Sequence, residues 1–206
     1  MKKLLLITLA TILFLFSVSS CIVLRDRPIS LYKKVKNTKI SLHRCGLPVI
    51  YLINKNVPEN VKTIIIRSFK YWDDLTEKNL FFYMGITNWS SDDIRSGIIV
   101  VVDIKELKTV EHEANGALAY TNLIWYTISG CLSNGGITIY KSSLELSDDR
   151  LESIIKHEVG HILGLGHSPH SKDLMHEVIR VFDRKKDLTE WELKAFKIYY
   201  DNKSAE

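Results

Sequence analysis

The sequence has few of the features that mark a repeat protein, a disordered chain or a nucleic-acid-binding protein. It contains no internal repeat and no low-complexity segment, and its net charge is only +4 over 206 residues. No recognition-helix or base-stacking pattern accompanies this mild charge, so we do not expect nucleic acid as a partner. With 46% hydrophobic and 25% charged residues, the chain has the composition of a globular protein, and its length suits one domain.

Charge is also missing from a long stretch near the N-terminus. After Lys3 no charged residue occurs before Arg25, and the apolar run between them ends in small residues, a layout typical of a secretory signal. The same run is long enough to span a bilayer, so an uncleaved membrane anchor is an alternative. Residues 18–21, Val-Ser-Ser-Cys, resemble the lipobox of bacterial lipoproteins, which implies a signal peptide over residues 1–20 and lipidation of Cys21. We therefore expect a membrane-anchored extracytoplasmic lipoprotein or, alternatively, a secreted protein.

The segment after the signal is polar and basic. Lysine and arginine dominate residues 21–47, and we predict a tether there that lies on an anionic membrane surface. A solvated linker explains the same composition. The folded domain is expected over residues 48–206.

Hydrophobic spacing within this domain predicts about five strands and three helices. Strands are expected over residues 49–54, 80–85, 97–104, 116–128 and 136–141, with Asn134-Gly135-Gly136 as a turn. A first helix follows Pro58, a second begins near Ser147, and a third runs from Thr189 to about Tyr200, with Thr189 and Glu192 as a capping box. This order of elements predicts one α+β domain.

Three histidines occur in the motif HEVGHILGLGH, residues 157–167. His157 and His161 are four residues apart, so on a helix they share one face and can bind one ion. On a continuing helix His167 would be rotated about 80° from that face and lie roughly 15 Å along the axis. Gly164 removes this difficulty, because glycine ends a helix by adopting a left-handed conformation without a Cβ clash. We therefore predict that the helix ends at Gly164 and that the chain turns back to bring His167 to the ion.

The residue after the first histidine points to hydrolysis. Three neutral imidazoles leave one position of a tetrahedral Zn²⁺ open for water, whose pKa the metal lowers to about 7. Glu158 can take the proton of that water and later pass it to a leaving amine. A structural zinc site needs neither the open position nor the glutamate.

The motif resembles the metzincin signature, HExxHxxGxxH followed by a Met-turn. Ser168, directly after the third histidine, is typical of the matrixin branch, and Met175 suits the methionine that metzincins place beneath the metal. The resemblance covers roughly residues 48–201. Within this range SFKYWDDLTEKNLFF resembles the first helix of matrixins running into their second strand, and LTEWELKAFKIYYD resembles their C-terminal helix. It implies a zincin-like catalytic domain with a mixed, twisted sheet and the active-site helix described above.

The resemblance also implies a place for substrate and a number of metals. NGALAY resembles the edge strand above the matrixin cleft, where Ala117, Leu118 and Ala119 would pair with the substrate backbone by strand addition. Vertebrate matrixins hold a second, structural zinc through additional histidines, but only His43 and His112 precede the motif here. We therefore predict one catalytic zinc, and the sequence leaves a calcium requirement open.

Two cysteines lie outside the predicted signal. A compartment outside the cytosol permits disulfides, and Cys45 and Cys131 can pair in only one way. Residues 44–48, Arg-Cys-Gly-Leu-Pro, also resemble the cysteine switch of matrixin pro-segments, in which a thiolate occupies the open zinc position. The strand predicted from residue 49 follows too closely for Cys45 to swing into the cleft. We favour the disulfide, with the switch and a free thiol as alternatives.

Together these features predict a zinc-dependent endopeptidase that acts as a monomer on extracytoplasmic proteins or peptides and is held at the membrane through Cys21. The alternative from another class is a non-catalytic, zinc-dependent surface binding or adhesion module on the same fold. The two hypotheses differ in whether Glu158 is needed.

Overall fold

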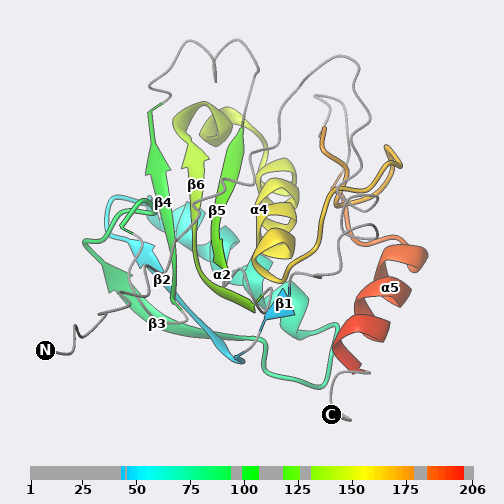
Figure 1. Cartoon of the computed structure of the whole chain (residues 1–206). Helices are drawn as coiled ribbons and strands as arrows, with labels where there is room; N and C mark the ends of the chain where they lie inside the picture. Colours follow the sequence, from blue (N-terminus) through cyan, green and yellow to red (C-terminus); the bar gives the residue numbers. More distant parts are fainter. Residues whose placement is uncertain are drawn as a thin grey trace, which may run out of the picture.

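A computed structural model describes residues 43–44, 46–93, 99–106, 118–125, 131–178 and 185–201. In chain order the elements are β1 (His43–Arg44), β2 (Val49–Asn54), α2 (Glu59–Asp73), β3 (Phe81–Thr87), β4 (Ile99–Lys105), β5 (Ala119–Trp125), β6 (Cys131–Tyr140), the 3-10 turn η1 (Lys141–Glu145), α4 (Asp148–Ile162) and α5 (Glu190–Asp201). The predicted α+β class is confirmed, with a mixed sheet and three helices among the described residues (Figure 1).

The strands form one sheet in the order β1-β6-β4-β2-β3, and β5 pairs with β6 outside this path. The β5–β6 pair is antiparallel, whereas the other pairs are parallel. Within the described chain, β5 therefore has one paired edge and leaves its other edge without a strand partner.

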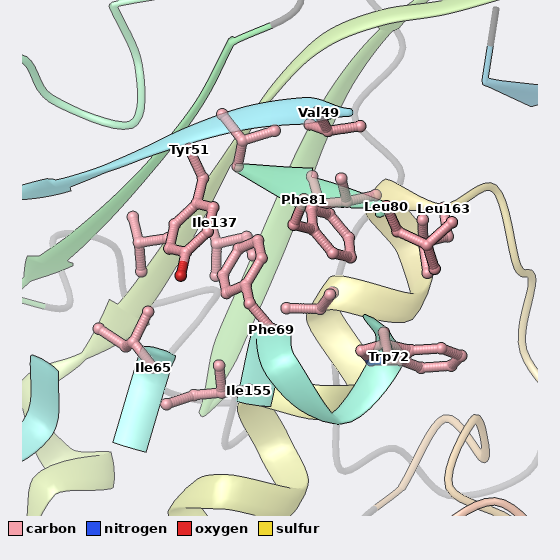
Figure 2. Packing of buried hydrophobic residues seen from close by; sticks show 14 of the residues in the cluster. Val49, Tyr51, Ile65, Phe69, Trp72, Leu80, Phe81, Ile137, Ile155 and Leu163 are labelled. Carbon is pink, nitrogen blue, oxygen red and sulfur yellow. The ribbon is translucent and has the colours of Figure 1, made fainter. Parts of the chain in front are cut away.

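The core lies between one face of the sheet and the helices α2 and α4. Val49, Tyr51 and Ile53 of β2 belong to one buried cluster, and alternate residues of a strand point to the same face. Phe69 of α2 stacks on Tyr51 with ring centroids 3.9 Å apart, and Trp72 lies one turn further along the helix (Figure 2). Because this cluster also includes residues of α4, the sheet and α2 hold the histidine-bearing helix in place.

The predicted turn at Asn134-Gly135-Gly136 is wrong, because these residues lie inside strand β6. They pair with β5 on one side, and Gly135 and Gly136 also pair with β4 on the other. A Cβ on Gly136 would lie only 2.0 Å from the backbone oxygen of Ser91. Glycine is present because another segment crosses the strand closely, and a hydrogen bond of 2.6 Å between the hydroxyls of Ser91 and Thr138 holds that segment.

The sheet begins earlier in the chain than the sequence pattern indicates. His43 and Arg44 fall within the predicted tether, yet they form β1 and pair with Cys131 and Leu132 of β6. Of the predicted strand over residues 116–128 the structure describes residues 118–125, and β5 spans Ala119–Trp125. None of the helices in the described part of the chain is long and apolar enough to cross a bilayer.

Candidate metal centre

Helix α4 presents His157 and His161 on one face and then ends where the sequence predicts. Its last helical residue is Ile162, and Gly164 follows with a φ of 92°. The N–H of Gly164 donates to the carbonyl of His161, and the N–H of Leu165 donates to the carbonyl of Gly160, at 2.9 and 3.0 Å. This pair of bonds is the Schellman arrangement, which requires a left-handed residue at the position of Gly164.

The turn brings His167 back to the other two histidines. The Nε2 atom of His161 lies 3.0 Å from that of His157 and 3.1 Å from that of His167. Zinc bound tetrahedrally at about 2.0–2.1 Å would place neighbouring ligand nitrogens about 3.3 Å apart, so the spacing fits one ion. Among the described residues, these histidines are the one group of three or more side chains whose ligand atoms converge in this way.

The opposite nitrogens of two of these rings fix their tautomers. The Nδ1 atoms of His157 and His161 each lie 2.8 Å from a backbone carbonyl, of Leu174 and Leu165 respectively. A carbonyl oxygen only accepts, so each Nδ1 carries the hydrogen and each Nε2 presents a lone pair. Lone pairs this close repel one another unless a cation lies between them, and this is why we read the Nε2 contacts as a metal site.

Burial keeps the three imidazoles neutral, as metal ligands must be. It lowers the pKa of His161 to about 4 and that of His167 to about 3. Burial also lowers the pKa of His157 well below its usual value, and the neighbouring His161 and His167 add to this effect. At neutral pH all three side chains are therefore ready to bind a cation.

Glu158 lies directly after the first histidine and is completely buried. Burial raises the pKa of its carboxyl group to about 7, and a hydrogen bond from Thr121 opposes that rise. The hydroxyl of Thr121 lies 2.5 Å from Oε2 of Glu158, whereas Oε1 has no hydrogen-bond partner among the described residues. A carboxyl group with a pKa near 7 can both accept and donate a proton at neutral pH.

Met175 packs beneath the metal-binding helix. The structure places its sulfur so close to Gly160 that a Cβ there would lie 2.5 Å from Sδ. The backbone N–H groups of Leu174 and Met175 donate to the carboxylate of Glu192, at 3.2 and 2.9 Å. Since the carbonyl of Leu174 accepts from His157, this turn connects α5 to the first histidine.

This site and its fold are those of a known family, because a model of the matrixins matches residues 49–201. The chain belongs to the matrixin family. Two relatives from Arabidopsis thaliana are similar to it. Metalloendoproteinase 2-MMP is 28% identical over 155 residues, which cover 69% of this chain and 37% of the relative. Metalloendoproteinase 1-MMP is 28% identical over 140 residues, which cover 64% of this chain and 35% of the relative.

The chain matches little more than a third of the length of these two relatives. The matrixin family is zinc-dependent, and the chain accordingly carries a zinc metalloendopeptidase-like domain. The three converging histidines are the residues that can hold this metal in the described structure.

The three residues predicted to pair with substrate have different surroundings in the structure, and one of them is not described. Ala117 lies outside the described residues. The carbonyl of Leu118 accepts hydrogen bonds from the N–H of Tyr140 and the hydroxyl of Ser143, so it is already used within the protein. Ala119 begins β5 and its side chain is fully buried. The Leu118 carbonyl is therefore engaged within the protein.

The cysteine predictions stay predictions. Cys21 and Cys45 both lie outside the described residues, as does His112. Cys131 is the first residue of β6 and pairs with His43, two positions before Cys45 in the chain.

Sequence reasoning missed two residues of the site. The sequence places Thr121 in a predicted strand without assigning it a role, and it predicts only a capping role for Glu192. The capping role of Glu192 is confirmed, because its carboxylate accepts the N–H of Thr189 at 2.9 Å. A hydroxyl between the apolar residues Ala119 and Leu123 was the available signal for Thr121.

Proposed function

We propose that this chain is a zinc-dependent endopeptidase that cuts peptide bonds of extracytoplasmic proteins. His157, His161 and His167 hold the metal, and Glu158 is the general base and acid. The observation that carries the proposal is the convergence of three imidazole Nε2 atoms, with that of His161 3.0 and 3.1 Å from the other two, beside a buried carboxyl group. A purely structural metal site has no need of this carboxyl group.

The metal and the protein have separate tasks in this reaction. Zinc, when bound, acts as a Lewis acid that polarises the scissile carbonyl and makes water acidic. Glu158 accepts the proton that the attacking water loses and then donates it to the nitrogen of the departing amine.

The substrate is proposed to lie extended along β5. The position of this strand supports the idea, because in the described sheet β5 pairs with β6 alone and an extended peptide can add to an outer strand through backbone hydrogen bonds. A matrixin usually carries Tyr-Pro after the Met-turn methionine, whereas this chain has His176-Glu177. We therefore expect a side-chain preference that differs from that of its relatives.

The location and assembly are proposed from the sequence alone. The Val-Ser-Ser-Cys pattern supports a lipid anchor at Cys21, which would keep a monomeric enzyme at the outer face of a membrane. A protein so anchored meets other extracytoplasmic proteins as its substrates.

The experiment that tests this function uses the full chain, purified in detergent and loaded with Zn²⁺. It is incubated with a diverse mixture of quenched peptides. The controls are the Glu158→Ala variant, a sample with chelator, and the Glu190→Ala variant, which removes an exposed glutamate of α5. We expect cleavage that falls by roughly 10²-fold or more in Glu158→Ala, disappears with chelator and persists in Glu190→Ala.

A different result would favour the other hypothesis. If one zinc binds per chain but no peptide is cut, Cys45→Ser should be measured next, because a latent enzyme would then become active. If that variant is inactive as well, the domain is a zinc-dependent binding module, and Glu158 will prove dispensable for its interaction.

A further inference from the structure

Thr121 places a hydroxyl group where packing calls for an apolar side chain. It lies on β5 between Ala119 and Leu123, and alternate residues of a strand share one face. Ala119 packs with Ile154 of α4 in a small apolar cluster, and Leu123 belongs to the main core. Thr121 itself is fully buried. A valine would fill the same space without burying a polar group.

Both hydrogen bonds of this hydroxyl go to a single residue. Its Oγ1 lies 2.5 Å from Oε2 of Glu158 and 3.2 Å from the backbone oxygen of Glu158. The shorter contact is the length of a charge-assisted O–H···O bond to a carboxylate. Among the described residues, the buried hydroxyl of Thr121 therefore forms hydrogen bonds only with Glu158.

We propose that Thr121 is a positioning residue, which holds the carboxyl group of Glu158 in one orientation with Oε2 engaged and Oε1 free. This inference rests on the proposed function in so far as Glu158 is the general base. The last torsion of a glutamate is broad, so a carboxyl group without a partner samples many orientations. The hydrogen bond to β5 selects one of them, and Oε1 is left as the oxygen without a partner in the described structure.

A hydroxyl suits this task because it can donate to a carboxyl oxygen in either protonation state of Glu158. Toward the carboxylate, Thr121 donates its hydrogen to Oε2. While Glu158 holds the proton on Oε1 during the reaction, Oε2 is a carbonyl oxygen that still accepts from Oγ1. The orientation of Glu158 is thus preserved through both halves of the cycle.

The strand that supplies this contact is also the strand proposed to bind substrate. β5 pairs with β6 and leaves its other edge free in the described sheet. The peptide and the general base are consequently aligned by the same seven-residue strand, Ala119–Trp125. A small displacement of the base relative to the scissile bond would reduce turnover much more than binding.

The test compares three variants of the full chain. Thr121→Val removes the hydroxyl and keeps the shape, whereas Thr121→Ser keeps the hydroxyl and removes a methyl group. Thr138→Val is the matched control, because Thr138 is a buried threonine on the neighbouring strand whose hydroxyl bonds to Ser91. Each variant is measured for kcat, KM, zinc stoichiometry and the urea midpoint of unfolding.

We expect Thr121→Val to bind one zinc and to lose roughly 10- to 100-fold in kcat, with KM nearly unchanged. Thr121→Ser should keep kcat within about threefold even if its unfolding midpoint falls, and Thr138→Val should also keep it. A role in packing alone predicts the reverse order, with the serine variant the more impaired. An unchanged kcat in Thr121→Val would overturn the inference.

A second measurement does not depend on activity. Thr121→Val is introduced into wild type and into Glu158→Ala, and the change in the unfolding midpoint is compared between the two backgrounds. If Thr121 holds Glu158, the two changes differ. Equal changes would show that the residues are not coupled and would overturn the inference. If wild type cuts no peptide, the proposed function fails, and this comparison still decides whether Thr121 holds Glu158.

Discussion

The carboxylate of Glu192, in the first turn of α5, accepts the backbone N–H of Met175 at 2.9 Å. Its other oxygen accepts the N–H groups of Leu174 and Thr189. The carbonyl of Leu174 in turn accepts from Nδ1 of His157. One buried carboxylate thus connects the C-terminal helix to a metal-binding ring through two residues of backbone.

Glu192→Gln is expected to weaken zinc binding although the side chain does not contact the metal. The amide of glutamine turns an NH₂ group toward N–H donors, and losing charged hydrogen bonds of this kind costs roughly 1.5–3 kcal/mol of stability. Mutation of a residue that orients a metal ligand typically lowers the affinity for the metal by about 10- to 100-fold. Competition with a chromophoric chelator measures the zinc affinity. Glu190→Gln, exposed in the same helical turn, is the control, and equal affinity in the two variants would contradict the connection.

Gly160→Ala is expected to destabilise the protein, contrary to the usual effect of alanine in a helix. Alanine normally stabilises a helix interior by about 1 kcal/mol relative to glycine. Here the new Cβ would lie 2.5 Å from Sδ of Met175 and 3.1 Å from Trp72, and such overpacking costs roughly 1–3 kcal/mol. Urea unfolding measures the change. The cost should shrink when Met175→Ala is also present, and a cost that stays the same would place the strain elsewhere.

Local chemistry made most of the metal site predictable. His157 and His161 are one helical turn apart, and Gly164 is the residue that a Schellman turn needs. These relationships involve residues close in the chain, so their geometry follows from helix dimensions. The capping of α5 by Glu192 was predictable for the same reason.

Contacts between distant segments were not predictable in this way. Thr121 and Glu158 are 37 residues apart, and their contact exists only because β5 packs against α4. The same limit explains the wrong turn at residues 134–136. The two glycines there give a turn signal, but the close passage of Ser91 over β6 is what requires Gly136. A glycine pair does not reveal whether it serves a turn or a crossing.

Removal of the metal is expected to lower the thermal stability of the domain. The Nε2 atoms of three imidazoles converge, at 3.0 and 3.1 Å from the middle one, and a ligand that binds only the folded state stabilises it by about 2.7 kcal/mol at 100 times its Kd. The unfolding temperature should therefore fall with a chelator and recover when Zn²⁺ is restored. His167→Ala should abolish most of this difference, whereas His170→Ala, an exposed histidine of the next turn, should keep it. Identical unfolding temperatures with and without chelator would contradict the assignment of the site.

The buried carboxylate of Glu152 is expected to control stability in acid. It lies on α4 and forms ion pairs with Lys156 at 2.8 Å and Lys185 at 2.9 Å, as well as with Arg67 of α2. Burial alone would raise the pKa of Glu152, but the hydrogen bonds from these three cations outweigh it and lower the pKa to about 2. The carboxylate therefore ties α2, α4 and the segment before α5 together as long as it is ionised.

This difference in pKa determines where stability is lost. The ordinary pKa of a glutamate, 4.5, applies to the unfolded chain, which therefore binds the proton before the folded chain does. The contribution of Glu152 is fully present above about pH 4.5 and disappears as the pH falls toward 2. Glu152→Gln should lose roughly 1.5–3 kcal/mol at neutral pH, because the buried Lys156 loses one of its two carboxylate partners and keeps only Asp187. Its stability should also vary less between pH 5 and 3 than that of wild type.

Glu59→Gln, which removes an exposed ion pair with Lys62, should change the free energy of unfolding by less than about 1 kcal/mol. Urea unfolding at several pH values distinguishes them, and parallel acid profiles for wild type and Glu152→Gln would show that another group controls stability in acid.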